Sequence, residues 1–322
     1  MALIDSTVGA AGVPGGESRP GLRRVISGLD WLWADRRAAM ATGFLAIVIL
    51  LAILAPLVTF HHPNAQSVTA ILDGPSADHW LGTDDLGRDV WARLVYGARV
   101  SLQASVIAVA VAIVLGVPAG LIAGFLSGWT DTVLMRIVDT LLAFPAIVLA
   151  VGITAALGPG LTNAMVAVGV VFAPSMARVT RGQVLATKER LYVDAAVTFG
   201  SPPWRTIVRH IVPNAIQPVI VQATLLLGLA LLAEASLSFI GLGVQAPEAS
   251  WGVMLRRAAQ FLSRAAYHIY APGLAIALTV LAFNALGDSL RDALDPVAGG
   301  RRRLQRAARR RRATTVDTVE PT

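Results

Sequence analysis

The chain of 322 residues is apolar and sparsely charged: 55% of its residues are hydrophobic, 15% are charged, and its mean hydropathy is +0.64. Soluble domains carry about 25% charged residues, so the composition excludes a typical soluble enzyme, and its apolar content excludes a disordered chain. The 27 basic residues outnumber the 20 acidic ones. Together with apolar runs of membrane length, this excess indicates a membrane protein with basic cytoplasmic ends rather than a nucleic-acid-binding protein.

The chain contains no cysteine and a single lysine, Lys188. A disulfide framework, a thiolate metal site and a cysteine nucleophile are therefore excluded. A P-loop requires Gly-Lys-Ser/Thr, whereas Lys188 lies between Thr187 and Glu189. If this protein uses ATP, the ATPase must be a separate chain.

Six stretches are long and apolar enough to predict membrane-spanning helices, each needing about 20 residues. They are residues 38–60, 100–125, 132–157, 164–177, 215–244 and 270–290. Prolines inside these stretches are tolerated where neighbouring helices satisfy the freed carbonyls. Gly116, Gly120 and Gly124 repeat every fourth residue, a spacing that predicts close helix packing. The sequence thus predicts an all-α membrane protein with about six transmembrane helices.

The distribution of arginine and lysine predicts the orientation of these helices. Basic residues gather in the tail at 1–37, in the loop between the fourth and fifth spans, and in the tail at 291–322. We therefore expect both termini to be cytoplasmic and the segment 61–99 to be extracytoplasmic. Arg256, Arg257 and Arg264 are exceptions, because this topology places them outside. Binding to lipid headgroups is sufficient to explain the basic C-terminal tail.

The cytoplasmic loop 187–214 has an ordered pattern that a simple linker would not need. Thr187 is a suitable cap for a helix over 188–199, and Gly200 stands where a helix C-terminus favours left-handed geometry. A second helix is predicted at 202–212, ending before Pro213, with Pro202 in its first turn. Its apolar stripe and its basic flank are formed by Trp204, Ile207, Val208, Ile211, Arg205 and Arg209.

Three stretches of this sequence carry a family resemblance. Residues 192–200 (YVDAAVTFG) with 210–214 (HIVPN) resemble the EAA loop of bacterial ABC-importer permeases. Residues 79–90 (HWLGTDDLGRDV) and 233–245 (AEASLSFIGLGVQ) resemble segments of dipeptide/oligopeptide permease C-type subunits. The resemblance covers residues 30–296, with Val197 replacing an expected basic residue.

The resemblance implies a type I ABC-importer permease-like bundle in the bacterial inner membrane, with its permease domain at 100–290. The loop would form a coupling helix that docks on the ATPase through Tyr192, Asp194, Ala195, Ala196, Gly200, Arg205, His210, Pro213 and Asn214. The implied partners are a second homologous permease, one or two P-loop ATPase subunits and an extracytoplasmic substrate-binding protein. ATP and magnesium would bind the ATPase and not this chain. The implied substrates are short peptides, with nickel, glutathione or another small solute as alternatives.

Two carboxylates within the predicted spans are candidates for a polar function. Glu234 lies deep in the fifth span, although a structural carboxylate bonded to a neighbouring helix is the favoured interpretation. Asp139 is expected to pair with Arg136, one turn away.

Other functional classes find less support in the sequence. A channel or an ion-coupled secondary transporter would favour repeated pore motifs or paired interrupted helices. An intramembrane enzyme needs a convergent catalytic set, which Asp139 and Glu234 alone do not provide, so no catalytic residue is assigned. His61, His62 and His79 have no tight ligand spacing, so we interpret them as solvated and expect no metal site.

Overall fold

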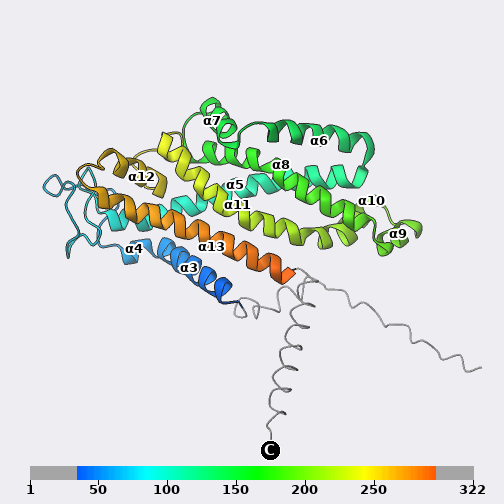
Figure 1. The fold of residues 1–322 in the computed structure, drawn as a ribbon, viewed down its shortest axis with the longest axis horizontal. Helices are drawn as coiled ribbons and strands as arrows, with labels where there is room; N and C mark the ends of the chain where they lie inside the picture. The colour runs from blue at the N-terminus through cyan, green and yellow to red at the C-terminus, as the bar shows by residue number, and fades with distance from the viewer. Residues whose placement is uncertain (1–34, 295–322) are drawn as a thin grey trace, which may run out of the picture.

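The computed structural model describes residues 35–294, which form helices joined by turns and loops, with one isolated bridge between Thr83 and Asp89 (Figure 1). The elements are α3 (Arg36–Ile53), α4 (Ala55–Val58), α5 (Val90–Leu126), α6 (Gly128–Ala143), α7 (Ala146–Leu157), α8 (Leu161–Lys188), α9 (Leu191–Thr198), α10 (Pro203–Thr206), the π-helical turn η1 (Ile207–Ile211), α11 (Val212–Ile240), α12 (Trp251–Gln260), the 3₁₀ turn η2 (Ala266–Ile269) and α13 (Tyr270–Leu294). The predicted all-α class is confirmed for the described part of the chain. Most of the two predicted tails, 1–37 and 291–322, lies outside these residues.

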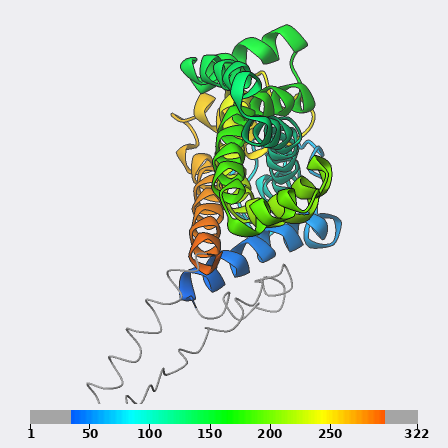
Figure 2. The same cartoon turned by 90° about the vertical axis from the view of Figure 1, so that its right-hand side faces the viewer.

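The long helices form an elongated bundle. Seen end-on, α5, α8 and α11 lie in the centre, with α6 and α7 on one side and α13 and α3 on the other (Figure 2). The main core contains buried alanine, valine, leucine and methionine side chains from α5, α7, α8 and α11. At one end of the bundle lie α12 and the loop 59–89, and at the other lies α9 (Figure 1). The candidate functional residues lie at these two ends.

The glycine repeat of α5 packs against α8, as the sequence predicts. A Cβ atom added at Gly124 would lie 2.8 Å from the Val184 Cβ, and one added at Gly120 would lie 2.7 Å from the Thr180 Cβ. Because such distances are sterically forbidden, these positions require glycine for the two backbones to approach.

Within residues 35–294, five helices are long and apolar enough to cross a membrane, and the pair α6 and α7 adds a sixth span only if the bent pair is counted as one. The prediction of one continuous helix over 132–157 is wrong, because the chain bends by 95° between α6 and α7. The break falls at Phe144, whose backbone is extended, and Pro145. A proline disfavours helical geometry at the residue before it, and Phe144, which precedes Pro145, ends α6 for this reason.

Two other spans begin or end far from their predicted limits. Helix α5 starts at Val90 rather than at residue 100, because the Asp89 carboxylate accepts a hydrogen bond from the Ala92 N–H at 2.7 Å and caps the helix. Helix α8 continues to Lys188 rather than ending at residue 177. The apolar pattern marks only the part of a helix that lies in lipid, and both helices extend beyond it.

Candidate functional site

The short helix α9 projects at the end of the bundle formed by α8 and α11 (Figure 1). It is followed by an elbow at Gly200, whose φ of +76° is left-handed as predicted. The turn is closed by hydrogen bonds from the Gly200 N–H to the Val197 carbonyl and from the Ser201 N–H to the Ala196 carbonyl, at 2.9 and 3.0 Å. The elbow therefore gives α9 a defined direction.

Two of the helix limits predicted in this loop are wrong: the start of the first helix and the end of the second. Thr187 is not a cap but lies buried in the last turn of α8, and the short helix begins at Leu191. The second helix does not end before Pro213: it runs from Pro203 through η1 into α11, as far as Ile240. Within η1 the Val212 N–H donates to the Ile207 carbonyl, and such wider turns accommodate a break in the regular helical hydrogen-bond ladder.

Large apolar side chains around α9 face outward. Leu191 is 86% exposed, Phe199 is 90% exposed and Trp204 is 67% exposed. The predicted stripe of the second helix is divided, since Ile211 is buried in the core whereas Trp204 and Val208 are exposed. Neighbouring exposed apolar groups are typical of a surface that contacts another protein or a membrane. We call Leu191, Val197, Phe199, Trp204 and Val208 the coupling patch.

The residues assigned to coupling lie on this elbow and on the start of α11. Tyr192 and His210 face each other across it, with ring centroids 6.4 Å apart. Burial raises the pKa of the Tyr192 phenol, which keeps it neutral. The structure leaves most of the set exposed: Tyr192, Asp194, Ala195, Gly200, Arg205, Pro213 and Asn214, with Ala196 and His210 half-buried.

Lys188 anchors the base of the elbow, a role the sequence did not reveal. Its Nζ donates to the Phe125 carbonyl at 2.8 Å and to the Ser127 Oγ at 3.2 Å, and it lies 5.6 Å from the centre of the Phe125 ring. Phe125 and Ser127 lie at the corner between α5 and α6. The lysine thus fixes the end of α8 to two other helices beside α9.

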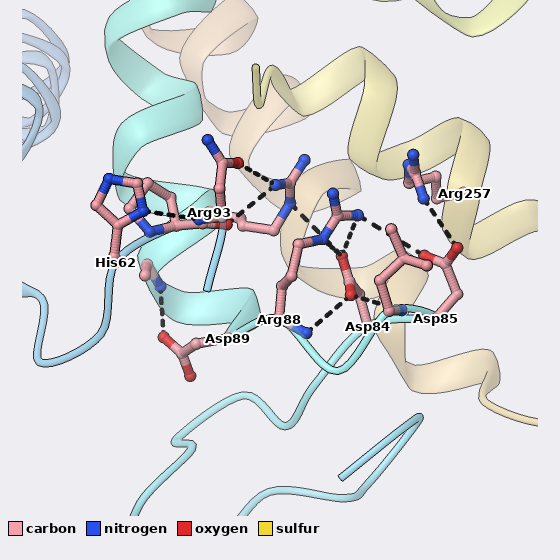
Figure 3. Close-up of polar contacts among 11 residues, drawn as sticks. His62, Asp84, Asp85, Arg88, Asp89, Arg93 and Arg257 are labelled. Atoms are coloured by element: carbon pink, nitrogen blue, oxygen red, sulfur yellow. Dashed lines mark hydrogen bonds and ion pairs between the residues drawn. The ribbon is translucent and has the colours of Figure 1, made fainter. Parts of the chain in front are cut away.

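At the opposite end, a cluster of charged residues orders the outer segment (Figure 3). The Arg88 Nε donates to the Asp84 Oδ2 at 2.7 Å, and the Arg93 Nε lies 3.5 Å from the same oxygen. Arg257 on α12 donates to the Asp85 Oδ2 at 2.8 Å. Arg88 and Arg93 are buried. We call these five residues the outer charge cluster.

The outer charge cluster includes one of the arginines that are exceptions to the predicted topology. Arg257, which that topology places outside, pairs with Asp85 of the segment predicted to lie on the same side. Arg93 also reaches the Pro63 carbonyl at 3.0 Å and the Asn64 Oδ1 at 3.1 Å. Arg93 therefore joins residues 63–64 to α5, and Arg257 joins Asp85 to α12.

Electrostatics hold Asp84 in its charged form. Burial by itself raises the pKa of this carboxyl, but hydrogen bonds from the Arg88 side chain and backbone and from the Leu86 N–H, with the Arg88 charge, outweigh it. The pKa of Asp84 consequently lies below its ordinary value.

Glu234 is fully buried and joins three elements. Its oxygens accept from the Ser238 Oγ at 2.7 Å and from the Ser101 Oγ of α5 at 3.1 Å. The Trp251 N–H at the start of α12 in turn donates to the Ser101 Oγ at 3.2 Å. This arrangement has the hydrogen bonds of a structural carboxylate near the outer end of α11.

Asp139 pairs with a residue of another helix. Its Oδ1 lies 2.6 Å from the Arg178 Nη2 of α8, so the expected partner on its own helix, Arg136, is corrected. Asp131 makes a two-point ion pair with Arg181, at 2.5 and 2.6 Å. Both pairs tie α6 to α8.

Comparisons with known proteins fit this architecture. The sequence model of the family described as "Binding-protein-dependent transport system inner membrane component" matches residues 116–298. The chain is 48% identical over 272 residues to a dipeptide transport system permease protein DppC of Alkalihalophilus pseudofirmus, covering 82% of this chain and 90% of the relative. It is 40% identical over 286 residues to a probable D,D-dipeptide transport system permease protein DdpC of Escherichia coli, covering 88% and 96%. It is 45% identical over 264 residues to a glutathione transport system permease protein GsiD of Salmonella typhimurium, covering 82% and 87%.

The fold is also similar to a chain of the MetNI methionine ABC transporter solved in inward-facing conformations. The TM-score is 0.51 and the identity 19%, with 63% of this chain and 97% of that chain covered, so the likeness concerns the fold alone. The chain belongs to the family of binding-protein-dependent transport system inner-membrane components and is a multi-pass membrane permease of the ABC-importer type.

Proposed function

We propose that this protein forms one half of the translocation pathway of an ATP-driven importer of short peptides, and that it couples to a separate ATPase through α9. A second homologous permease supplies the other half, and a binding protein delivers the substrate from outside. ATP and magnesium bind the ATPase subunits, and this chain carries out no chemical step.

The coupling patch is the observation that carries this proposal. Phe199 is 90% exposed and Leu191 is 86% exposed at the end of the bundle where the basic loop lies. Burying such side chains against a partner is favourable by about 1.5–3 kcal/mol each, whereas leaving them in water gains nothing. The left-handed backbone of Gly200 and the hydrogen bond of Lys188 to the Phe125 carbonyl hold this patch in a defined orientation, as expected of a docking element that transmits motion.

Peptide transport is supported by the relatives named for dipeptide permeases. The relative named for glutathione, itself a small peptide, keeps that solute among the candidates. Glu234 gives no support to an ion-coupled mechanism, because both of its oxygens accept hydrogen bonds inside the protein and its side chain is fully buried.

The test is uptake by proteoliposomes that hold this chain, its second permease and the ATPase, with the binding protein added. We expect dipeptide accumulation that requires ATP inside the vesicles. Glutathione and Ni²⁺ are offered in parallel: transport of Ni²⁺ without any peptide would contradict the proposed substrate class, whereas transport of glutathione alone would restrict the class to that peptide.

Coupling is tested separately with Ala196→Arg on α9. The bulky charge beside the coupling patch should prevent co-purification of the ATPase while membrane insertion stays intact. Ala186→Arg, at an exposed position of α8, is the matched control. Recovery of the ATPase at equal levels with both variants would argue against docking through α9.

A further inference from the structure

Three potential metal ligands from distant parts of the outer segment come together beside the start of α5. They are His61, which follows α4, His79, and Asp89, the cap of α5. One ligand atom from each lies within 4.8 Å of the other two. We propose that His61, His79 and Asp89 bind a divalent transition-metal ion of the zinc class on the extracytoplasmic side.

The spacing of the three groups is close to that of a bound site. The His79 Nδ1 lies 2.9 Å from the Asp89 Oδ1, and the rings of His61 and His79 are 4.6 Å apart at 36°. Zinc binds nitrogen and oxygen ligands at about 2.0–2.2 Å in a tetrahedron, so its ligands are about 3.4 Å from one another. For a metal to bind, the His61 ligand atom needs to approach by up to about 1.4 Å, and the hydrogen-bonded His79 and Asp89 atoms need to separate by about 0.5 Å.

Asp89 is already oriented for this role. Its Oδ2 accepts from the Ala92 N–H at 2.7 Å, and this cap fixes the carboxylate and leaves Oδ1 facing His79. Its side chain is 3% exposed. In Figure 3 Asp89 lies at the beginning of α5, apart from the outer charge cluster, whose arginines bind other acidic groups.

An aromatic cluster holds the three segments together. The rings of Phe60 and Trp80 meet at 5.4 Å, and those of Trp80 and Trp91 meet at 5.7 Å. Each of these residues adjoins or closely follows one of the proposed ligands in the chain. The ligands are therefore brought together by packing that does not depend on the metal.

The donor set indicates the class of ion. Two imidazoles and one carboxylate suit zinc and neighbouring transition metals, whereas calcium and magnesium prefer oxygen ligands alone. Three protein ligands leave a fourth position for water or for a group from a partner. The bound ion would cross-link the chain after α4 to the start of α5 and stabilise the outer segment, a role independent of the proposed transport function.

The test uses the full-length chain in detergent, purified with a histidine-free tag and stripped with EDTA. Titration with ZnCl₂ by calorimetry should show one site per chain, and MgCl₂ should show none. His61→Gln and His79→Gln should weaken zinc binding at least about 10-fold. His62→Gln is the matched control, since His62 is exposed and next in sequence to His61; it should leave the affinity within twofold.

A replacement ligand keeps the test independent of folding. His61→Cys exchanges one zinc ligand for another and should retain binding and the zinc-induced rise in thermal stability. The proposal is overturned if the wild-type chain binds no zinc at millimolar concentration, if His62→Gln weakens binding as much as His61→Gln, or if His61→Gln has no effect.

Discussion

The two ends of this permease differ in which side chains they bury and which they expose. At the outer end, charged side chains are buried and paired within the chain: Arg88 is 3% exposed and Arg93 is 2% exposed. At the α9 end, here called the inner end, apolar side chains such as Phe199 are not covered by the rest of the chain. The outer end therefore pairs its arginines and aspartates within the chain, whereas the α9 end leaves apolar groups uncovered, in line with the proposed docking on an ATPase. Stability and docking should be separable by mutation at the two ends.

The largest effect is expected from breaking the outer charge cluster. Arg88→Met removes the cation that donates to Asp84. Breaking a fully buried ion pair from one side costs about 3–5 kcal/mol, which is an upper bound here because Asp84 is half-buried and keeps Arg93 at 3.5 Å. Thermal unfolding in detergent should show a large loss of stability. Arg99→Met is the matched control, because Arg99 is exposed. Equal stability of the two variants would show that the cluster does not hold the outer end.

At the coupling patch we expect little loss of stability but weaker binding of the ATPase. Phe199→Asp should leave unfolding within about 0.5 kcal/mol, since substitutions at exposed positions are usually near neutral. Binding of the ATPase should weaken by about 30-fold, because an interface anchor contributes about 2 kcal/mol or more. The measurement is ATPase affinity by surface-immobilised binding, alongside thermal unfolding. Loss of stability with unchanged affinity would reverse the assignment of the two ends.

A smaller effect, dependent on pH, is expected for Asp84. Because its folded pKa is below the ordinary value, its charge stabilises the fold above the ordinary pKa, and this contribution is lost as the pH falls through the folded pKa. Asp84→Asn should thus lower stability at neutral pH by about 1.5 kcal/mol, the effect of a hydrogen bond to a charged group. The gap should close in acid, as the pH falls below the ordinary pKa of 3.8 for an aspartate. A gap that stays constant to pH 3 would contradict this role for the charge.

The sequence predicted most of the framework, because long apolar runs and the glycine repeat of α5 are local signals. Helix ends were predicted poorly where charged residues interrupt the apolar run: residues 90–99 of α5 contain Arg93 and Arg99, and residues 178–188 of α8 contain Arg178 and Arg181, although both stretches are helical. The bend at Pro145 depends on which neighbouring groups satisfy the freed carbonyls, and a single sequence does not show them.

The candidate sites show the same difference between features with a local sequence signal and features that depend on distant contacts. The elbow at Gly200 was predicted because glycine after a helix is a local signal, whereas the exposure of Phe199 depends on how α9 leaves the bundle. His61 and His79 were interpreted as solvated because they lie 18 positions apart, without the tight spacing of metal ligands, yet the loop brings their rings to 4.6 Å. Contacts between distant segments are tertiary information, which motif spacing does not contain.

The smallest predicted effect concerns the direction of α9. Gly200→Ala adds a methyl group into open space, but the φ of +76° remains unfavourable for alanine, by about 1 kcal/mol. The elbow should relax, and ATPase affinity should fall about fivefold for that energy, with little change in global stability. Gly182→Ala, also in open space but within α8, is the matched control, and alanine there should be neutral or slightly stabilising. Equal ATPase affinity for the two variants would show that the left-handed elbow, unlike the exposed side chains beside it, does not contribute to docking.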